Sequence, residues 1–305
     1  MTRRIVALVS ALVASLLGHL ALWGGGGVLA QEAAQYARRG PNVVAVLVLV
    51  LGLLLIAAAI ATVAISAAGV IALGIIHIVV SLLTVLSPAD ASGGSVSPIF
   101  GIFAFVYRTS QSVSDGLYLY FPTGFGLLTG VIFLVVGLAA LARTGASSTQ
   151  ARVVSVVVAV VVGFFALAAA VSGGFRLYAS QLQLLSGLDA LGLVLLIAAT
   201  IALAIAVLTV RWSSAGVLVL GAATIVLTIA LFGLFTTSTL PGFVMSVSRE
   251  LGQGLANALP DGNLALVGVL LVVGGLAVRW RALRRPRATD PAPVADADVT
   301  PAASV

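Results

Sequence analysis

Long apolar runs follow one another along almost the whole chain, and short polar segments separate them. A helix that crosses the ~30 Å hydrocarbon layer of a membrane needs about 20 apolar residues. Residues 43–86 form too long a run for one crossing, so they predict two helices that turn at residues 66–69. The whole pattern predicts an all-α polytopic membrane protein with eight transmembrane helices, at roughly residues 4–27, 43–64, 68–87, 121–142, 152–174, 190–210, 214–235 and 263–281.

The predicted spans fall into two sets of four with related sequences. One block recurs at a displacement of 138 positions: Pro122, Gly124, Gly130 and Gly137 reappear as Pro260, Gly262, Gly268 and Gly275. Another block recurs at 147 positions: Ser66, Gly69, Val70, Leu73 and Gly74 reappear as Ser213, Gly216, Val217, Leu220 and Gly221. The displacements differ because the loop between the two blocks is longer in the first set. This recurrence predicts a tandem repeat of two four-helix units.

Four spans in each unit give both units the same orientation in the membrane. We therefore expect a parallel repeat, with a first membrane unit at residues 1–145 and a second at residues 150–282. Fusion of two copies of an ancestral homodimer subunit explains this arrangement most simply. Residues 283–305 contain few large apolar side chains, and we expect them to form a disordered cytoplasmic tail.

The composition agrees with immersion in lipid. Hydrophobic residues make up 61% of the chain and charged residues only 8%, which is outside the range of soluble domains. The net charge of +6 comes from arginines, and the predicted topology places ten of them on the side of both termini and five on the other. This distribution follows the positive-inside rule, so we expect a cell-membrane protein with cytoplasmic termini and no nucleic-acid partner. The absence of lysine and the abundance of arginine, alanine, valine and glycine are typical of a G+C-rich bacterial genome.

The first apolar run follows Arg3 and Arg4 and shares some features with a cleavable signal peptide. It is longer than the usual apolar region of such peptides, and it occupies the place in the first unit that the fifth span has in the second. Gly26 even precedes Gly173 by 147 positions, as Gly27 precedes Gly174. We therefore expect the run to be retained as a transmembrane helix.

The long outer loops contain short amphipathic patterns. In the second unit, apolar residues recur every four positions between polar ones: Val247, Leu251, Leu255 and Leu259. A similar stripe in the first unit consists of Val106, Val113 and Leu117. We expect short interfacial helices in both loops. They either seal the bundle or form a lid or partner-binding surface, in which Arg108 and Arg249 would contact an outer ligand or partner.

Small polar residues inside the spans form a candidate polar seam: Ser15, His19, His77, Ser81, Thr84, Thr224 and Thr228. Spacings of three and four residues place the members within each span on one helical face. Small and hydroxyl-bearing residues at such a face allow close helix packing and hydrogen bonds between helices. The alternative is that the seam lines the path of a substrate.

His19 and His77 are the two histidines of the chain, and both lie well inside predicted spans. An ionisable residue within the membrane is a functional candidate, and two imidazoles on neighbouring helices can ligate haem iron. Thr224 stands in the place of His77 in the second unit, so such a haem site would be single. Three interpretations stay open: hydrogen-bonded packing, a proton or substrate role and, remotely, a bis-His haem.

Catalytic motifs are missing from the sequence, which contains no HExxH, GxSxG or Walker A pattern. We therefore expect no catalytic residue, no metal site and no cofactor. The favoured function is a non-enzymatic scaffold or accessory subunit of a membrane complex, whose partners are the lipid bilayer and other membrane proteins. The alternative is a transporter of a small neutral or amphiphilic molecule along the interface between the two repeats. A haem-bearing electron-transfer protein is the remote third function.

Overall fold

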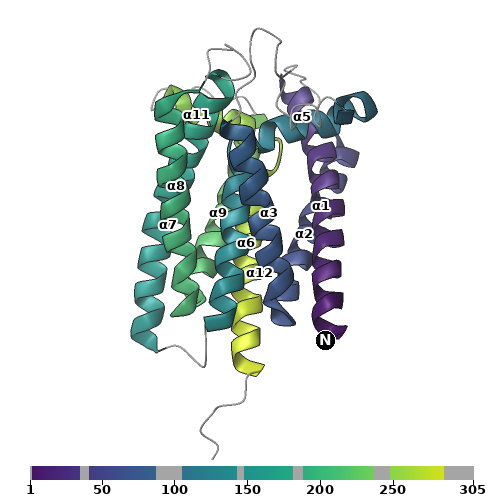
Figure 1. Ribbon diagram of the computed structural model, residues 1–305. Helices are drawn as coiled ribbons and strands as arrows, with labels where there is room; N and C mark the ends of the chain where they lie inside the picture. Colours follow the sequence, from purple (N-terminus) through teal and green to yellow (C-terminus); the bar gives the residue numbers. More distant parts are fainter. Residues whose placement is uncertain are drawn as a thin grey trace, which may run out of the picture.

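The computed structural model describes residues 2–34, 41–86, 105–142, 148–180, 188–236 and 248–284, and these residues form an all-helical bundle (Figure 1). Eight helices in these ranges are long and apolar enough to cross a membrane. They are α1 (Thr2–Ala34), α2 (Val43–Ala61), α3 (Ala67–Leu86), α6 (Phe125–Ala142), α7 (Thr149–Tyr178), α8 (Ala190–Leu208), α9 (Ala215–Thr236) and α12 (Asn263–Arg284). The predicted all-α fold is thereby confirmed, and the eight apolar helices support a multi-pass membrane protein.

Large apolar side chains cover the outside of the bundle. Phe165 on α7 is 73% exposed, and Leu47 on α2 and Val226 on α9 are 62% and 67% exposed. Soluble monomers rarely show apolar patches of this extent. The exposed side chains are those that face lipid in a membrane.

Two short helices lie at the end of the bundle opposite the start of α1 and the end of α12 (Figure 1). They are α5 (Gln111–Tyr120) and α11 (Arg249–Ala258). Each begins at a serine whose hydroxyl accepts a backbone N–H bond, Ser110 at 3.5 Å and Ser248 at 3.3 Å. The short helices that the amphipathic patterns predict are therefore present in both loops. Val247, the first residue of the predicted stripe in the second unit, lies outside the described residues.

Each short helix leads into a transmembrane helix through a tight turn that contains a glycine. Gly124 has a φ of 81° and Gly262 a φ of 76°, a conformation that glycine adopts without steric cost. The fourth span begins at Phe125 rather than at residue 121, because residues 121–124 form this turn.

Polar side chains and short 3₁₀ turns fix the ends of α2 and α8. The Asn42 side chain caps α2 by accepting a hydrogen bond from the backbone N–H of the third residue of α2. The Asp189 side chain caps α8 in the same way, by accepting one from the third residue of α8. The short turns Thr62–Ala64 and Thr209–Arg211 end these two helices and lead into α3 and α9. The break predicted at residues 66–69 thus falls where α3 begins.

The helices from the two ends of the chain interlock. The helix α1 packs against α2 and α7 against α8, while α3 packs against α6 and α9 against α12. Contacts also cross between the halves, because α12 packs against α2, α6 packs against α8, and α6 meets α12 at the centre (Figure 1). Near the end of α12, Arg281 donates a hydrogen bond of 2.7 Å to the carbonyl oxygen of Val63. Both halves of the chain therefore share one core.

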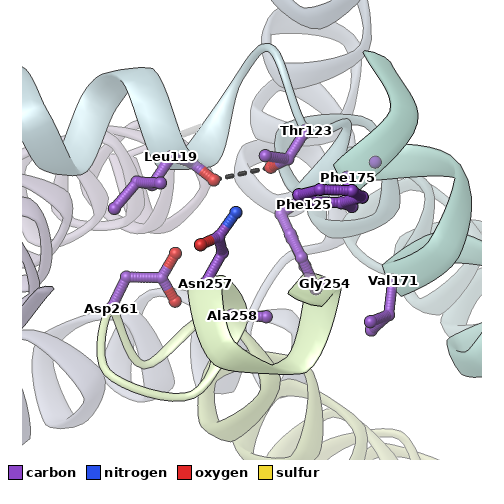
Figure 2. Close-up of a pocket in the computed structure, with 10 residues that line it drawn as sticks. Leu119, Thr123, Phe125, Val171, Phe175, Gly254, Asn257, Ala258 and Asp261 are labelled. Carbon is purple, nitrogen blue, oxygen red and sulfur yellow. Dashed lines mark hydrogen bonds between the residues drawn. The ribbon is translucent and has the colours of Figure 1, made fainter. Parts of the chain in front are cut away.

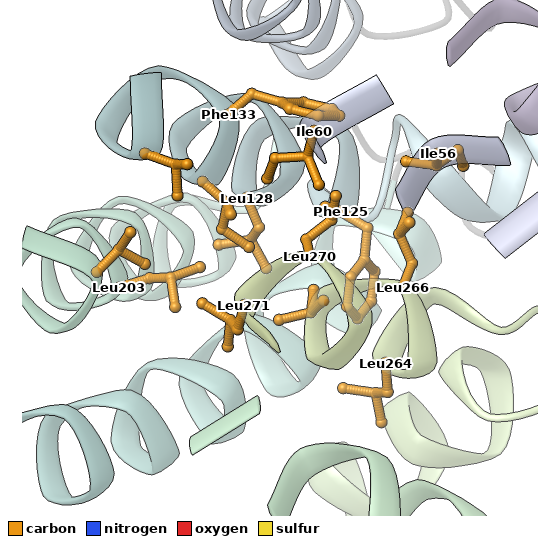
Figure 3. Close-up of a cluster of buried hydrophobic side chains, with 14 of the residues drawn as sticks. Ile56, Ile60, Phe125, Leu128, Phe133, Leu203, Leu264, Leu266, Leu270 and Leu271 are labelled. Carbon is orange, nitrogen blue, oxygen red and sulfur yellow. The ribbon is translucent and has the colours of Figure 1, made fainter. Parts of the chain in front are cut away.

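That core is apolar and close-packed where α2, α6, α8 and α12 meet. Figure 3 shows Ile60, Leu128, Leu203 and Leu270 in this cluster, each from a different helix, and all are at most 1% exposed. Burial of such side chains provides the main packing energy of a compact interior, where few voids are tolerated.

Glycines let the paired helices approach closely. A Cβ atom added to Gly74 would lie 2.6 Å from the backbone nitrogen of Leu134 on α6 and 2.9 Å from the carbonyl oxygen of Gly130. A Cβ on Gly221 would lie 2.8 Å from the carbonyl oxygen of Gly268 on α12. These distances are too short for any side chain, so the α3–α6 and α9–α12 contacts depend on glycine.

Candidate functional site

Two histidines and a tyrosine from three helices meet in the interior of the bundle. His19 comes from α1, His77 from α3, and Tyr120 is the last residue of α5. They are 2%, 7% and 0% exposed. His19 Nε2 lies 3.2 Å from His77 Nε2 and also 3.2 Å from the Tyr120 hydroxyl. We call these three residues the histidine cluster.

The helix backbones hold both imidazole rings from the other side. His19 Nδ1 lies 2.7 Å from the carbonyl oxygen of Ser15, and His77 Nδ1 lies 2.9 Å from that of Leu73. Each carbonyl belongs to the residue four positions earlier on the same helix. Because a carbonyl oxygen only accepts hydrogen bonds, each Nδ1 is the donor. The two Nε2 atoms are thereby turned toward each other.

Aromatic side chains surround the cluster. The ring of His19 lies 5.4 Å from that of Trp23 and 5.5 Å from that of Tyr120, measured between centroids, and the ring of His77 lies 5.6 Å from that of Phe133. Burial raises the pKa of the Tyr120 phenol, so this hydroxyl stays protonated and can donate a hydrogen bond.

The cluster geometry gives no support to the haem interpretation. An iron held by two imidazoles lies between their Nε2 atoms, with the porphyrin plane across the gap. Here the two Nε2 atoms are in direct contact and the ring centroids are 4.7 Å apart, which leaves no space for a macrocycle. A metal cluster is likewise not formed by histidine, aspartate and glutamate among the described residues.

Ser15 and His19 are a serine and an imidazole in contact, the residue types of a nucleophile and its base. Ser15 Oγ lies 3.3 Å from His19 Nδ1, but that nitrogen already donates to the Ser15 carbonyl oxygen and cannot act as a base. Ser15 is also only 2% exposed. The His19 Nδ1 atom beside the serine is therefore occupied by the Ser15 carbonyl oxygen.

All seven residues of the polar seam are buried. Only Ser15, His19 and His77 come together in one group. Thr84, Thr224 and Thr228 each donate a hydrogen bond of 2.7–2.8 Å to a carbonyl oxygen four positions earlier in their own helix. Ser81 Oγ is buried without a hydrogen-bond partner. The three threonines thus bond within their own helices, whereas Ser15, His19 and His77 contact one another.

The two arginines predicted to meet an outer ligand, Arg108 and Arg249, are both exposed. The ion pairs of the described residues form instead around Arg176 on α7, which lies 3.0 Å from Asp189 and 3.5 Å from Glu250 on α11. The hydrogen bonds from the Arg176 guanidinium lower the pKa of Asp189 below its usual value. Arg176 therefore ties α7 to α8 and α11.

A buried carboxyl group that the sequence pattern did not single out lies at the turn between α11 and α12. Asp261 is 3% exposed, although its place in an outer loop suggested solvent. Its oxygens accept hydrogen bonds from the backbone N–H of Asn263 (3.0 Å) and from the Asn263 side-chain amide (2.6 Å). No arginine pairs with it among the described residues, and burial raises its pKa well above the usual value.

Asp261 lines a small pocket that residues of both halves enclose. Figure 2 shows the side chains of Asp261 and Asn257 directed into the same space, beside the carbonyl oxygen of Leu119 to which Thr123 donates a hydrogen bond. The space between atoms is about 220 Å³ and partly open, with free room for about one water molecule. The sequence feature that could have indicated this site is a carboxylate, Asp261, with the amides of Asn257 and Asn263 close to the turn at Gly262.

Four buried polar atoms in the described residues have no hydrogen-bond partner: Trp23 Nε1, Ser81 Oγ, Ser114 Oγ and Thr129 Oγ1. All four belong to the first half of the chain. Buried polar atoms are usually paired, so this part of the interior is the less completely satisfied one.

No protein-family model, no curated protein and no solved structure matches this chain. The functional argument therefore rests on the geometry of its own residues.

Proposed function

We propose that the chain is a non-enzymatic protein of the cell membrane that works as a scaffold or accessory subunit for other membrane proteins. The observation that supports this function best is the close packing of apolar side chains where α6 contacts α12 (Figure 3). Leu128, Leu266 and Leu270 there are 1%, 0% and 0% exposed. Close packing of the described side chains where α6 meets α12 suits a support for partners better than a carrier.

We also propose that the bundle is a tandem repeat of two like-facing four-helix units, residues 1–145 and 150–282. Reciprocal contacts support the repeat. The side chain of Leu196 on α8 packs over Gly124 in the first turn, and Leu49 on α2 packs over Gly262 in the second. The two leucines are 147 positions apart and the two glycines 138, the displacements of the sequence blocks.

The contacts of α1 and α7 support the same repeat, with a shift of one residue in the alignment of these two helices. The backbone of Gly26 lies against Asp261, and that of Gly174 lies against Thr123. Asp261 and Thr123 are 138 positions apart, as expected, but the two glycines are 148 apart rather than 147. The equivalence of α1 and α7 is therefore shifted by one residue from the alignment of Gly27 with Gly174.

The proposed orientation places both termini in the cytoplasm and α5 and α11 outside a bacterial cell. The start of α1 and the end of α12 lie at the same end of the bundle, which fits this topology (Figure 1). Because the chain has no cysteine, single cysteines report orientation cleanly. A membrane-impermeant maleimide should label Arg108→Cys and Arg249→Cys in intact cells but label Arg284→Cys only after lysis. Labelling of Arg284→Cys from outside would overturn the topology.

The scaffold role is tested by isolating the tagged chain from its native membranes in a mild detergent. A partner protein in fixed stoichiometry is expected, and it should be lost with Arg249→Glu, because Arg249 is exposed on α11 at the proposed outer face. Arg284→Glu at the opposite end is the matched control and should keep the partner. Recovery of the chain alone, by cross-linking in intact cells as well as after extraction, would overturn this role.

A transporter of a small neutral molecule is the second candidate, and the polar pocket at Asp261 favours it. Osmotic swelling of liposomes in glycerol or urea would measure such transport. If a route follows the polar seam, Thr224→Val and Ser81→Ala should slow swelling, whereas Phe165→Ala on the lipid-facing side should not. Swelling no faster than that of empty liposomes would exclude these solutes.

A further inference from the structure

We propose that His19 and His77 together form a binding site for a single proton, which the two Nε2 atoms share in the interior of the first half. The site is independent of the proposed scaffold role. It follows from counting the protons that the observed contacts require.

The contacts of the two imidazoles need three protons on four ring nitrogens. Both Nδ1 atoms face carbonyl oxygens at 2.7 and 2.9 Å, so both must carry hydrogen. A neutral imidazole has one N–H, and two neutral rings would then present two bare Nε2 lone pairs to each other at 3.2 Å. Any other neutral tautomer turns a lone pair of Nδ1 toward a carbonyl oxygen. One additional proton between the Nε2 atoms satisfies every contact.

Tyr120 supplies the alternative state. Its hydroxyl lies 3.2 Å from His19 Nε2, and this nitrogen has one in-plane lone pair for either Tyr120 or His77. Without the extra proton, the Tyr120 hydroxyl donates to His19. With it, the His77 N–H donates to His19, and the phenol must turn elsewhere. Thr129 on α6 lies beside the phenol, and its buried hydroxyl has no hydrogen-bond partner other than this phenol. The Thr129 hydroxyl is therefore available as a hydrogen-bond partner for the displaced Tyr120 hydroxyl.

Burial disfavours any charge on the imidazole pair, and the surroundings offset this cost for one charge but not for two. The rings of Trp23, Tyr120 and Phe133 lie within 5.6 Å of an imidazole, a range in which aromatic rings stabilise a cation. The segments packed around the pair contribute few titratable groups. Asp115 on α5 is paired with Gln31, and α2, α3 and α6 carry no other ionisable residue. A second proton would place two cations 3.2 Å apart without a counter-ion.

Proton uptake at this site couples α1 and α3 to α5. Tyr120 is the last residue of α5 and precedes the turn into α6. Exchange of its partner from His19 to Thr129 changes the contact between α5 and the interior. A change in acidity at the two histidines is therefore transmitted to the short helix α5 at the end of the bundle.

The test uses the fact that the chain contains only two histidines. The intact protein, labelled with ¹⁵N-histidine in lipid nanodiscs, is titrated from about pH 8 to about pH 4, and circular dichroism follows the helices. The proposal expects both rings to change together and the nitrogen signals to report one added proton per chain. Nitrogen signals that stay constant while the helices persist would show a neutral packing pair. Two separate uptakes that end with both rings charged would overturn the shared site.

Two variants separate the site from a structural role. In His77→Thr, which introduces the residue found at Thr224, the signals of His19 should stay neutral across the same range. In Tyr120→Phe, which removes the donor that favours the neutral state, the ratio of protonated to neutral pairs at a given pH should rise about fivefold. Uptake by His19 alone in His77→Thr, or no change of the ratio in Tyr120→Phe, would each contradict the proposal. Phe165→Ala on the lipid-facing side should behave as the wild type.

Discussion

The first and second halves of the chain contribute different side chains to the core that they share. In the first half, His19, His77, Tyr120 and Trp23 form a polar and aromatic group around α1, α3 and α5. At the corresponding positions of the proposed repeat, the second half has Leu167, Thr224, Ala258 and Val171. The glycine contacts of α3 with α6 and of α9 with α12 are nevertheless alike. The glycine contacts are therefore common to both halves, whereas the histidine cluster is confined to the first half.

The second half has polar groups of its own, but they lie at the turn between α11 and α12. Asp261 and Asn263 stand where the first half has Thr123 and Phe125. The Asn263 amide crosses to the first half, where it donates a hydrogen bond of 3.1 Å to the carbonyl oxygen of Leu119. The two halves thus differ in where each buries its ionisable groups. The first half buries the two histidines among α1, α3 and α5, and the second half buries Asp261 at the turn between α11 and α12.

The largest effect is expected where the halves are alike. Gly74→Ala and Gly221→Ala should each destabilise the bundle by about 1–3 kcal/mol, because the added methyl group meets backbone atoms that cannot move aside. Gly233→Ala on α9 is the matched control, since a Cβ there meets no atom of the described residues within 4 Å, and it should not destabilise. Reversible unfolding in detergent with added denaturant measures the three. Tolerance of only one of Gly74→Ala and Gly221→Ala would show that the helix pairs are not equivalent.

The second effect separates the cluster from the fold. His19→Leu should cost about 1–3 kcal/mol of unfolding free energy, because it leaves His77 Nε2 buried without a partner and takes the acceptor at 3.2 Å away from the Tyr120 hydroxyl. The combination His19→Leu, His77→Thr and Tyr120→Phe removes all three polar groups and should recover most of that loss. A triple variant much less stable than His19→Leu would mean that the first half needs the cluster to fold. The same denaturant series decides between these outcomes.

The sequence predicted the spans well because a membrane helix is specified by length and hydrophobicity alone. It also placed His19 and His77 well inside two separate spans, since both lie far from the ends of their apolar runs. Their direct contact and the role of Tyr120 could not be predicted, because both depend on how α5 turns back onto α1. Burial of Asp261 was missed for a related reason: its position in a loop indicates solvent unless another segment covers it.

Asp261 offers the third test, at the turn where the halves differ. Its raised pKa means that the folded protein binds this proton more tightly than the unfolded chain. The resulting stability is fully present below the unfolded value of 3.8 and is lost as the pH rises through the folded pKa. Asp261→Asn removes the titration, so the variant should gain stability relative to the wild type as the pH increases. Unfolding free energies of both proteins across the pH range give the difference, and a difference independent of pH would show that the carboxyl is hydrated.

The smallest effect concerns the caps of α2 and α8. Asn42 caps α2 without charge, whereas Asp189 caps α8 and also pairs with Arg176 at 3.0 Å. Asp189→Asn makes the second cap resemble the first and should cost only about 0.5 kcal/mol, because partly exposed ion pairs contribute little. Arg176 lowers the pKa of Asp189, so its contribution is present above the unfolded pKa and is lost as the pH falls through the folded one. The difference between wild type and Asp189→Asn should therefore shrink in acid, whereas Asn42→Ala should lower stability equally at each pH. An Asp189→Asn effect that persists in acid would assign the contribution to the cap geometry alone and leave the two halves alike at this end.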